Sequence, residues 1–156
     1  MMQRSYLAYR YFLQGHNCAQ AVLCAFSDVL QMDEQTLASI SIAFGAGFGR
    51  TRRQCGAVSM MGVVAGVVTQ RLASPTEDKA QVYRDVQELI RLFEERNGSI
   101  ECAQLLKDVK NLTQGYRPQA RDEEYYRVRP CIKFVLDAVE ILERYYDISD
   151  EIPDRA

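Results

Sequence analysis

Apolar residues along this chain recur every three to four positions, in stretches separated by Gly, Asn, Pro and Ser. Such spacing predicts amphipathic helices, and no stretch alternates strongly enough to predict a strand. A short helical piece is expected near Tyr125 and Tyr126, next to the longest candidate loop, residues 110–124. The other predicted helices cover residues 2–13, 18–30, 33–44, 55–72, 76–97 and 100–109, with a final helix from Pro130. The pattern therefore predicts an all-α helical bundle.

The apolar stretch 55–72 differs from the others because small residues recur in it at helical spacing. These residues are Gly56, Ala57, Ser59, Gly62, Ala65 and Gly66. Small side chains let other backbones come close to a helix, so we expect this one to lie at the centre of the bundle. The glycine-rich loop 45–54 precedes it, and Gly45 to Gly49 is expected to form a compact turn with at least one glycine at positive φ. Thr76 is the predicted cap of the next helix, which follows a turn at residues 74–76.

Length and charge narrow the class of protein. At 156 residues the chain is predicted to form a single helical domain over residues 1–156, with a frayed polar tail at residues 147–156. A formal net charge of −2 gives no bulk attraction to nucleic acid, which is not expected as a partner. The longest apolar run, residues 55–68, falls short of the ~18 residues that suggest a membrane span. No basic-then-apolar leader opens the sequence, and we expect a cytoplasmic protein.

Chemistry is expected at the cysteines. Four of the five, Cys18, Cys55, Cys102 and Cys131, fall in the first turn of a predicted helix. A helix N-terminus offers free N–H groups and a partial positive charge, which lower a thiol pKa and favour the nucleophilic, metal-binding thiolate. We therefore predict that these four residues meet at one site. Cys24 lies on a different helical face from Cys18 and is expected to be an ordinary buried residue.

Three classes of function remain open from the residues alone. The first is thiol–disulfide or electron-transfer chemistry, with a thiol–disulfide oxidoreductase or electron carrier acting on a redox partner protein. The second is a thiolate metal site for zinc or an iron–sulfur cluster. The third is a non-enzymatic helical interaction module with buried, inert cysteines. No two cysteines have the CxxC spacing that would predict a local zinc knuckle or a thioredoxin-type motif.

The flanking residues add smaller expectations. Arg50, Arg52 and Arg53 precede Cys55 and would stabilise its thiolate if they point toward the site. His16, the single histidine, is expected to be a solvated turn residue. The tyrosines near residues 125 and 145 lie among charges and are expected at a partly exposed rim or an oligomer surface, with a homodimer as the candidate assembly.

The chain resembles the family of redox-active proteins named for a Cys, Gly-Cys-Ala-x-x-Gly, Cys, Cys pattern. The resemblance implies a redox or metal-linked role for Cys18, Cys55, Cys102 and Cys131 but supplies no substrate. Gly45, Gly47, Gly49 and Gly56 are the positions where backbone is expected to approach the thiols or a cofactor bound by them. The matching segments are Asn17-Cys18-Ala19-Gln20-Ala21-Val22, Phe44-Gly45-Ala46-Gly47-Phe48-Gly49-Arg50, Cys55-Gly56-Ala57-Val58-Ser59, Cys102 and Cys131.

Overall fold

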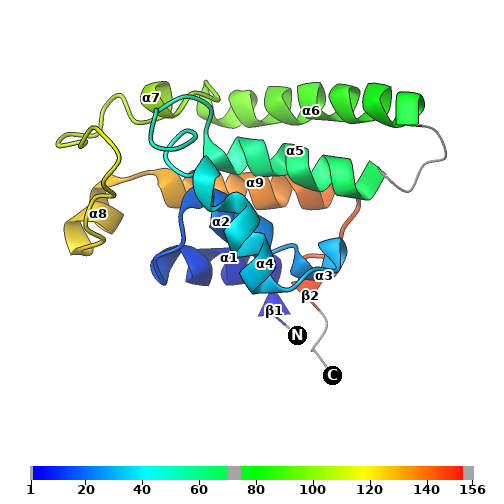
Figure 1. The fold of residues 1–156 in the computed structure, drawn as a ribbon, viewed down its shortest axis with the longest axis horizontal. Coiled ribbons are helices and arrows are strands. Elements are labelled where there is room, and N and C mark those ends of the chain that lie inside the picture. The colour runs from blue at the N-terminus through cyan, green and yellow to red at the C-terminus, as the bar shows by residue number, and fades with distance from the viewer. Residues whose placement is uncertain (1, 70–74, 153–156) are drawn as a thin grey trace.

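A computed structural model describes residues 2–69 and 75–152 and confirms that the protein is all-α (Figure 1). Apart from a two-residue strand pair, the regular elements are helices. They are α1 Arg4–Leu13, α2 Cys18–Cys24, α3 Ser27–Leu30, α4 Glu34–Ser41, α5 Gly56–Thr69, α6 Pro75–Asn97, α7 Cys102–Leu105, α8 Glu123–Val128 and α9 Cys131–Tyr145, with a 3₁₀ turn at Ile42–Phe44. None of the helices in the described residues is both long and apolar enough to cross a membrane.

Helix α5 packs against α2, α6 and α9, which agrees with its predicted central place. Its buried residues include Val58, Met60, Met61 and Val64, which lie in one core with residues of α2 and α9. Helix α9 in turn packs against α1, α2, α5 and α6. The small residues of α5 do not all pack closely against neighbouring helices. A Cβ on Gly56 would clash with α2, whereas a Cβ on Gly66 would meet nothing within 4 Å, so the expected tight packing at Gly66 is wrong.

Chain direction brings several helix ends together. Helices α5 and α9 both start at one end of the bundle, and α6 runs the opposite way and finishes there (Figure 1). Helices α7 and α8 lie at this same end, beside the loop that precedes α5 (Figure 1). The backbone N–H groups that the first turns of α5 and α9 leave free therefore point toward a common region.

Several predicted element bounds are wrong. The helix expected over 18–30 is interrupted at Ala25 and Phe26, so Cys24 ends α2 instead of lying in mid-helix. The helix expected over 100–109 is reduced to α7, whose Cys102 and Ala103 N–H groups donate to the loop carbonyls of Arg53 and Arg52. Helix α6 begins at Pro75, so Thr76 lies inside it and is not its cap. The expected end of α5 at residue 72 and the turn at Ser74 lie outside the described residues.

The two ends of the described chain meet. Met2–Gln3 (β1) pairs antiparallel with Glu151–Ile152 (β2), a strand pair that the sequence pattern did not predict. The buried guanidinium of Arg4 donates to the Asp28 carboxylate at 2.5 and 2.9 Å, to Ala25 O and to Ser149 O. Part of the segment expected to fray, up to Ile152, is thus bonded to the start of the chain, and residues 153–156 lie outside the described part.

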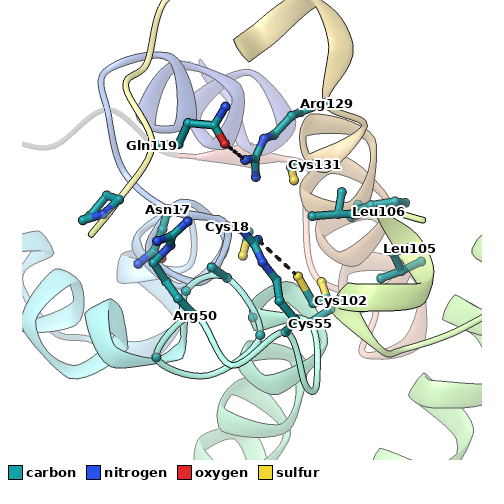
Figure 2. A pocket seen from close by; sticks show the side chains of 18 of the residues that line it. Asn17, Cys18, Arg50, Cys55, Cys102, Leu105, Leu106, Gln119, Arg129 and Cys131 are labelled. Atoms are coloured by element: carbon teal, nitrogen blue, oxygen red, sulfur yellow. Dashed lines mark hydrogen bonds between the residues drawn. The ribbon is translucent and has the colours of Figure 1, made fainter. Parts of the chain in front are cut away.

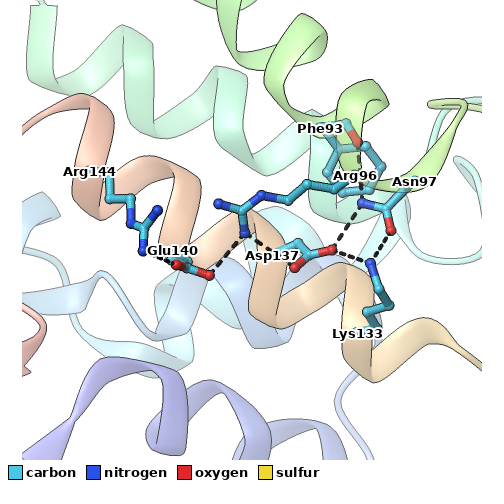
Figure 3. A network of polar contacts seen from close by, with 7 residues as sticks. All are labelled: Phe93, Arg96, Asn97, Lys133, Asp137, Glu140 and Arg144. Atoms are coloured by element: carbon cyan, nitrogen blue, oxygen red, sulfur yellow. Dashed lines mark hydrogen bonds and ion pairs between the residues drawn. The ribbon is translucent and has the colours of Figure 1, made fainter.

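A surface network joins the end of α6 to α9 (Figure 3). Asp137 accepts from Lys133 at 2.7 Å, from the Asn97 amide at 3.1 Å and from Arg96 at 3.3 Å. Glu140 bridges Arg96 and Arg144 further along α9. Such partly exposed pairs stabilise a fold by only ~0.2–1 kcal/mol each. Their main effect is to fix the register of α6 against α9, next to the end of the bundle where the thiols lie.

Candidate thiol pocket

A cavity of about 300 Å³ lies at the end of the bundle where the helices start, and all four predicted cysteines line it (Figure 2). Cys18, Cys102 and Cys131 are the first residues of α2, α7 and α9, and Cys55 directly precedes α5. Cys24 does not line the pocket, and its thiol donates to Glu34 O at 3.5 Å. The structure therefore brings together the four thiols that sequence reasoning grouped and separates the fifth. Gly45, Gly47, Gly49 and Gly56 also line the cavity.

The loop before α5 positions Cys55 and Cys102. Gly47 has φ +74° and Gly49 has φ +60°, which confirms the predicted turn, but Ala46, Phe48, Arg50 and Arg52 also adopt positive φ. Non-glycine residues in this region cost energy and persist only when the surrounding structure holds them. Backbone hydrogen bonds provide that support: Cys55 N donates to Ile100 O at 2.7 Å, and Cys102 N donates to Arg53 O at 2.6 Å. These backbone hydrogen bonds hold Cys55 and Cys102, which are far apart in the sequence, in the same part of the structure.

Cys18 is the thiol that the site holds as a thiolate. The neighbouring Cys55 thiol, together with the N–H groups of Ala46, Gly56 and Ala19, outweighs burial and lowers the pKa of Cys18 from 9.0 to about 6. The start of α2 is fixed by a capping box, in which Asn17 Oδ1 accepts from Gln20 N at 2.9 Å and Gln20 Oε1 accepts from Asn17 N at 3.0 Å. At neutral pH Cys18 is therefore largely ionised.

The other three thiols are held in the neutral form. The hydrogen bond to Cys18, burial and the nearby Cys18 charge raise the pKa of Cys55 well above its usual value. Burial and the Cys18 charge raise the pKa of Cys131 to about 12. Burial also raises the pKa of Cys102, although Arg52 lies 3.8 Å from its sulfur and opposes the shift. One thiolate among three thiols avoids the repulsion that four clustered thiolates would suffer.

A wall of residues from the polar stretch after α7 closes the pocket, and sequence reasoning missed it. Arg121, Tyr125 and Arg129 line the cavity with Tyr116, Pro118 and Gln119. Tyr125 is buried, with 8% of its surface exposed, so its expected place on an exposed rim is wrong. Arg121 and Arg129 lie 4.6 and 4.4 Å from its ring centroid. The four-residue spacing of Arg121, Tyr125 and Arg129 was a sequence signal that could have found them.

Two expectations for single residues also need adjustment. Of the three arginines ahead of Cys55, Arg50 and Arg52 line the pocket, whereas Arg53 is exposed and does not. His16 is half-buried and stacks on Tyr11 with ring centroids 5.3 Å apart, so it is more than a solvated turn residue. Its backbone carbonyl accepts a hydrogen bond from Arg121 at 3.1 Å, and its ring does not line the cavity.

Zinc and iron–sulfur clusters need several donor side chains around one point. Within residues 2–69 and 75–152, no three side chains of His, Cys, Asp or Glu are close enough together to hold a metal ion. Sulfurs that share one ion at ~2.3 Å lie within about 4 Å of one another. The four cysteines share a pocket, but among the described residues their sulfurs are not arranged as ligands of one zinc ion or iron–sulfur cluster.

The fold and the cavity define an all-α protein with four cysteines clustered around one pocket. The sequence identifies the family: a family model described as "Putative redox-active protein (C_GCAxxG_C_C)" matches residues 16–145. The chain belongs to this family. No curated protein and no solved structure matches it.

Proposed function

We propose that the protein is a thiol–disulfide oxidoreductase in which Cys18 attacks the substrate and Cys55 resolves the intermediate. The observation that carries this proposal is that Cys18 and Cys55 line one cavity and act on each other, which lowers the pKa of Cys18 and raises that of Cys55. Such a pair supplies the two roles that disulfide exchange requires: a nucleophile ionised near neutral pH and a second thiol that is activated later.

Exposure supports the same assignment of roles. Cys18 is half-buried and faces the cavity, whereas Cys55 is only 5% exposed. The pocket reaches solvent beside Ile42 and Tyr116, which are exposed lining residues. Of the two thiols, Cys18 is therefore the more accessible to a substrate. Cys131 is also half-buried, but its raised pKa makes it a poor nucleophile at neutral pH.

The reaction proceeds in two exchange steps. The Cys18 thiolate attacks one sulfur of a substrate disulfide, forming a mixed disulfide and releasing the other sulfur as a thiolate. Cys55 then loses its proton to solvent or to the departing sulfur and attacks the Cys18 sulfur, which releases the second substrate thiolate. Two protein thiols are oxidised to one disulfide, and one substrate disulfide is reduced to two thiols. A dithiol reductant, such as a redox partner protein, reverses the change and completes the cycle.

The test is a redox titration of the purified, reduced protein. Under anaerobic conditions it is equilibrated in glutathione buffers spanning roughly −180 to −320 mV, trapped by alkylation and analysed by peptide mass spectrometry. We expect one reversible disulfide joining Cys18 and Cys55, lost in Cys18→Ser and Cys55→Ser. Cys24→Ser is the matched control, because Cys24 lies outside the pocket, and it should titrate like the unaltered protein.

Two results would overturn the proposal. One is the absence of any reversible disulfide in this range. The other is a disulfide that persists in Cys18→Ser and joins Cys102 to Cys131. Metal analysis of the same sample checks the metal-site alternative, because bound zinc or iron would show that the thiols rearrange around an ion.

A further inference from the structure

The thiol pocket carries an excess of positive charge. Arg50, Arg52, Arg121 and Arg129 line it, and no Asp or Glu of the described chain does. None of these four arginines forms an ion pair within residues 2–69 and 75–152, although other arginines of the protein do. Among the described residues that line the pocket, Cys18 has the lowered thiol pKa and carries the negative charge. Four cations thus surround one negative charge in a partly buried space.

Neutral acceptors hold these arginines in place. Arg50 donates to Thr113 Oγ1 at 2.8 Å and to Gly115 O at 2.9 Å. Arg121 donates to His16 O at 3.1 Å, and Arg129 donates to Gln119 Oε1 (Figure 2). Carbonyl and amide oxygens orient a guanidinium without cancelling its charge. The arginines are therefore fixed in position and remain available to an anion.

Arg52 has a buried donor that is unpaired among the described residues. It is buried, with 8% of its surface exposed, and its Nε–H has no hydrogen-bond partner in the described part of the chain. A buried donor left unpaired costs ~1–3 kcal/mol, so native structures seldom contain one without a reason. Its Nη atoms contact Cys102 Sγ at 3.8 Å and Thr113 O at 3.3 Å, and neither acceptor is charged. An anion in the pocket would satisfy this guanidinium.

Repulsion between the arginines points the same way. Burial, together with the positive charges of Arg52 and Arg129, lowers the pKa of Arg50. Like charges close together in a partly buried site raise the free energy of the empty pocket. An anionic ligand would remove this cost on binding, which is how a site gains both affinity and selectivity for charge.

The rest of the lining is apolar and aromatic. Phe12, Leu106, Tyr125 and Phe134 face the cavity, and the Arg121 guanidinium lies 4.7 Å from the Phe12 ring centroid. A volume of about 300 Å³ suits one small organic group and excludes a folded polypeptide. A fitting ligand therefore has an apolar or aromatic body and a negatively charged end.

We propose that the substrate of this pocket is a small organic disulfide whose apolar or aromatic arm carries a carboxylate, bound by the four arginines beside Cys18. This inference rests on the proposed function for its disulfide and on the arginines and the apolar lining for its anionic arm. The exchange is the one given above: the arm seated in the pocket forms the mixed disulfide with Cys18, and the other arm leaves as a thiolate. The carboxylate takes no part in the chemistry and orients the arm.

The first experiment compares two disulfides that differ in charge. The rate of oxidation of the reduced protein is measured at pH 7 with the dianionic 5,5′-dithiobis(2-nitrobenzoate) and with the neutral 4,4′-dithiodipyridine. In Arg121→Gln and Arg129→Gln we expect the dianion rate, relative to the neutral rate, to fall about tenfold, as loss of one charge-assisted contact implies. Arg129→Lys keeps the charge and should retain most of the preference. Arg53→Gln is the matched control from the same loop, because Arg53 does not line the pocket.

The second experiment needs no redox step, so the two proposals can fail separately. Cys18→Ser is titrated with 2-naphthoate and with its neutral analogue 2-naphthalenemethanol, whose fluorescence is read without interference because the protein has no Trp. We expect naphthoate to bind at least about tenfold more tightly, and Arg121→Gln in the same background to remove the difference. Equal binding of the two, or an unchanged rate ratio in both glutamine variants, overturns this inference. Selective naphthoate binding without a Cys18–Cys55 disulfide in the redox titration would instead overturn the proposed function.

Discussion

At the scale of single residues, the site contains two thiols that act on each other. Cys18 and Cys55 have the same side chain, yet their pKa values are shifted in opposite directions. Their mutual interaction is the largest cause of both shifts, and backbone N–H groups stabilise the charged form of each. A shared proton between two sulfurs thus becomes an asymmetric pair, with one nucleophile and one proton donor.

This asymmetry predicts the pH dependence of thiol reactivity. Alkylation of Cys18 by neutral iodoacetamide should rise with a midpoint near pH 6, because only the thiolate reacts. In Cys55→Ala the largest cause of the shift is absent, so the midpoint should move upward, toward the usual 9.0. Peptide mass spectrometry after timed quenching measures each site separately. A midpoint that stays near pH 6 in Cys55→Ala would show that the Cys55 hydrogen bond is not the main cause.

The same pKa shift predicts how stability depends on pH. Between about pH 6 and pH 9.0 the unfolded chain keeps the Cys18 proton that the folded chain has lost. The stability that the thiolate contributes is therefore present above pH 9.0 and is lost as the pH falls through about 6. Urea unfolding of the reduced protein at pH 6 and pH 8.5 should show a rise in the free energy of unfolding that is smaller in Cys18→Ser. An equal rise in both proteins would contradict the assignment of the thiolate to Cys18.

At the scale of elements, the site requires α5 to begin in direct contact with α2. A Cβ on Gly56 would lie 2.6 Å from Phe44 O, 2.8 Å from Cys18 Sγ and 3.0 Å from Ala19 Cβ. These distances are below van der Waals contact, and two of the neighbours belong to the first turn of α2. Glycine at position 56 thus allows the Gly56 N–H to reach the Cys18 sulfur.

Two alanine substitutions in α5 form a matched pair. Gly56→Ala should destabilise the protein by ~1–3 kcal/mol through overpacking and should also raise the Cys18 alkylation midpoint. Gly66→Ala places its Cβ in open space within the same helix and should stabilise by roughly 0.5–1 kcal/mol. Urea unfolding measures both changes. Equal effects of the two substitutions would contradict the close approach at Gly56.

At the scale of the whole molecule, Arg4 connects segments that are far apart in sequence. It bonds to Ala25 and Asp28 around α3 and to Ser149 near the C-terminal end, and its guanidinium lies 4.8 Å from the Phe26 ring centroid. These contacts surround a side chain that is 1% exposed. In Figure 1, α3, β1 and β2 lie away from α7 and α8.

Removal of Arg4 is predicted to destabilise the fold and leave the site chemistry intact. Arg4→Met should lower the free energy of unfolding by roughly 2–4 kcal/mol, because Asp28 and two carbonyls lose their donor. Arg91→Ala is the control: Arg91 pairs with Glu88 and Glu95 on the exposed face of α6 and should cost less than ~1 kcal/mol. Thermal unfolding and the Cys18 alkylation midpoint should be measured together. A loss below about 1 kcal/mol in Arg4→Met would show that contacts other than those of Arg4 hold the two chain ends together.

Local pattern was sufficient for much of the fold. The 3.6-residue period predicts the helices, and helix-start signals placed Cys18, Cys55, Cys102 and Cys131 at or beside first turns. Boundaries set by distant contacts were not predictable in this way. Helix α7 starts where its Cys102 and Ala103 N–H groups bond to the loop at residues 52–53, and the β1–β2 pair joins residues about 150 positions apart.

For the site, the sequence by itself determined which thiols lie at helix starts, because capping and periodicity act over a few residues. The tertiary structure decided the rest. Antiparallel α6 returns the chain so that α5 and α9 start at the same end, and only there does Cys55 reach Cys18. The arginine and tyrosine wall at residues 116–129 lies partly outside helix α8, so helical periodicity did not place its side chains in the pocket. The charge balance of the pocket depends on residues that are far apart in the sequence and meet only in the folded chain, so no single stretch of sequence predicts it.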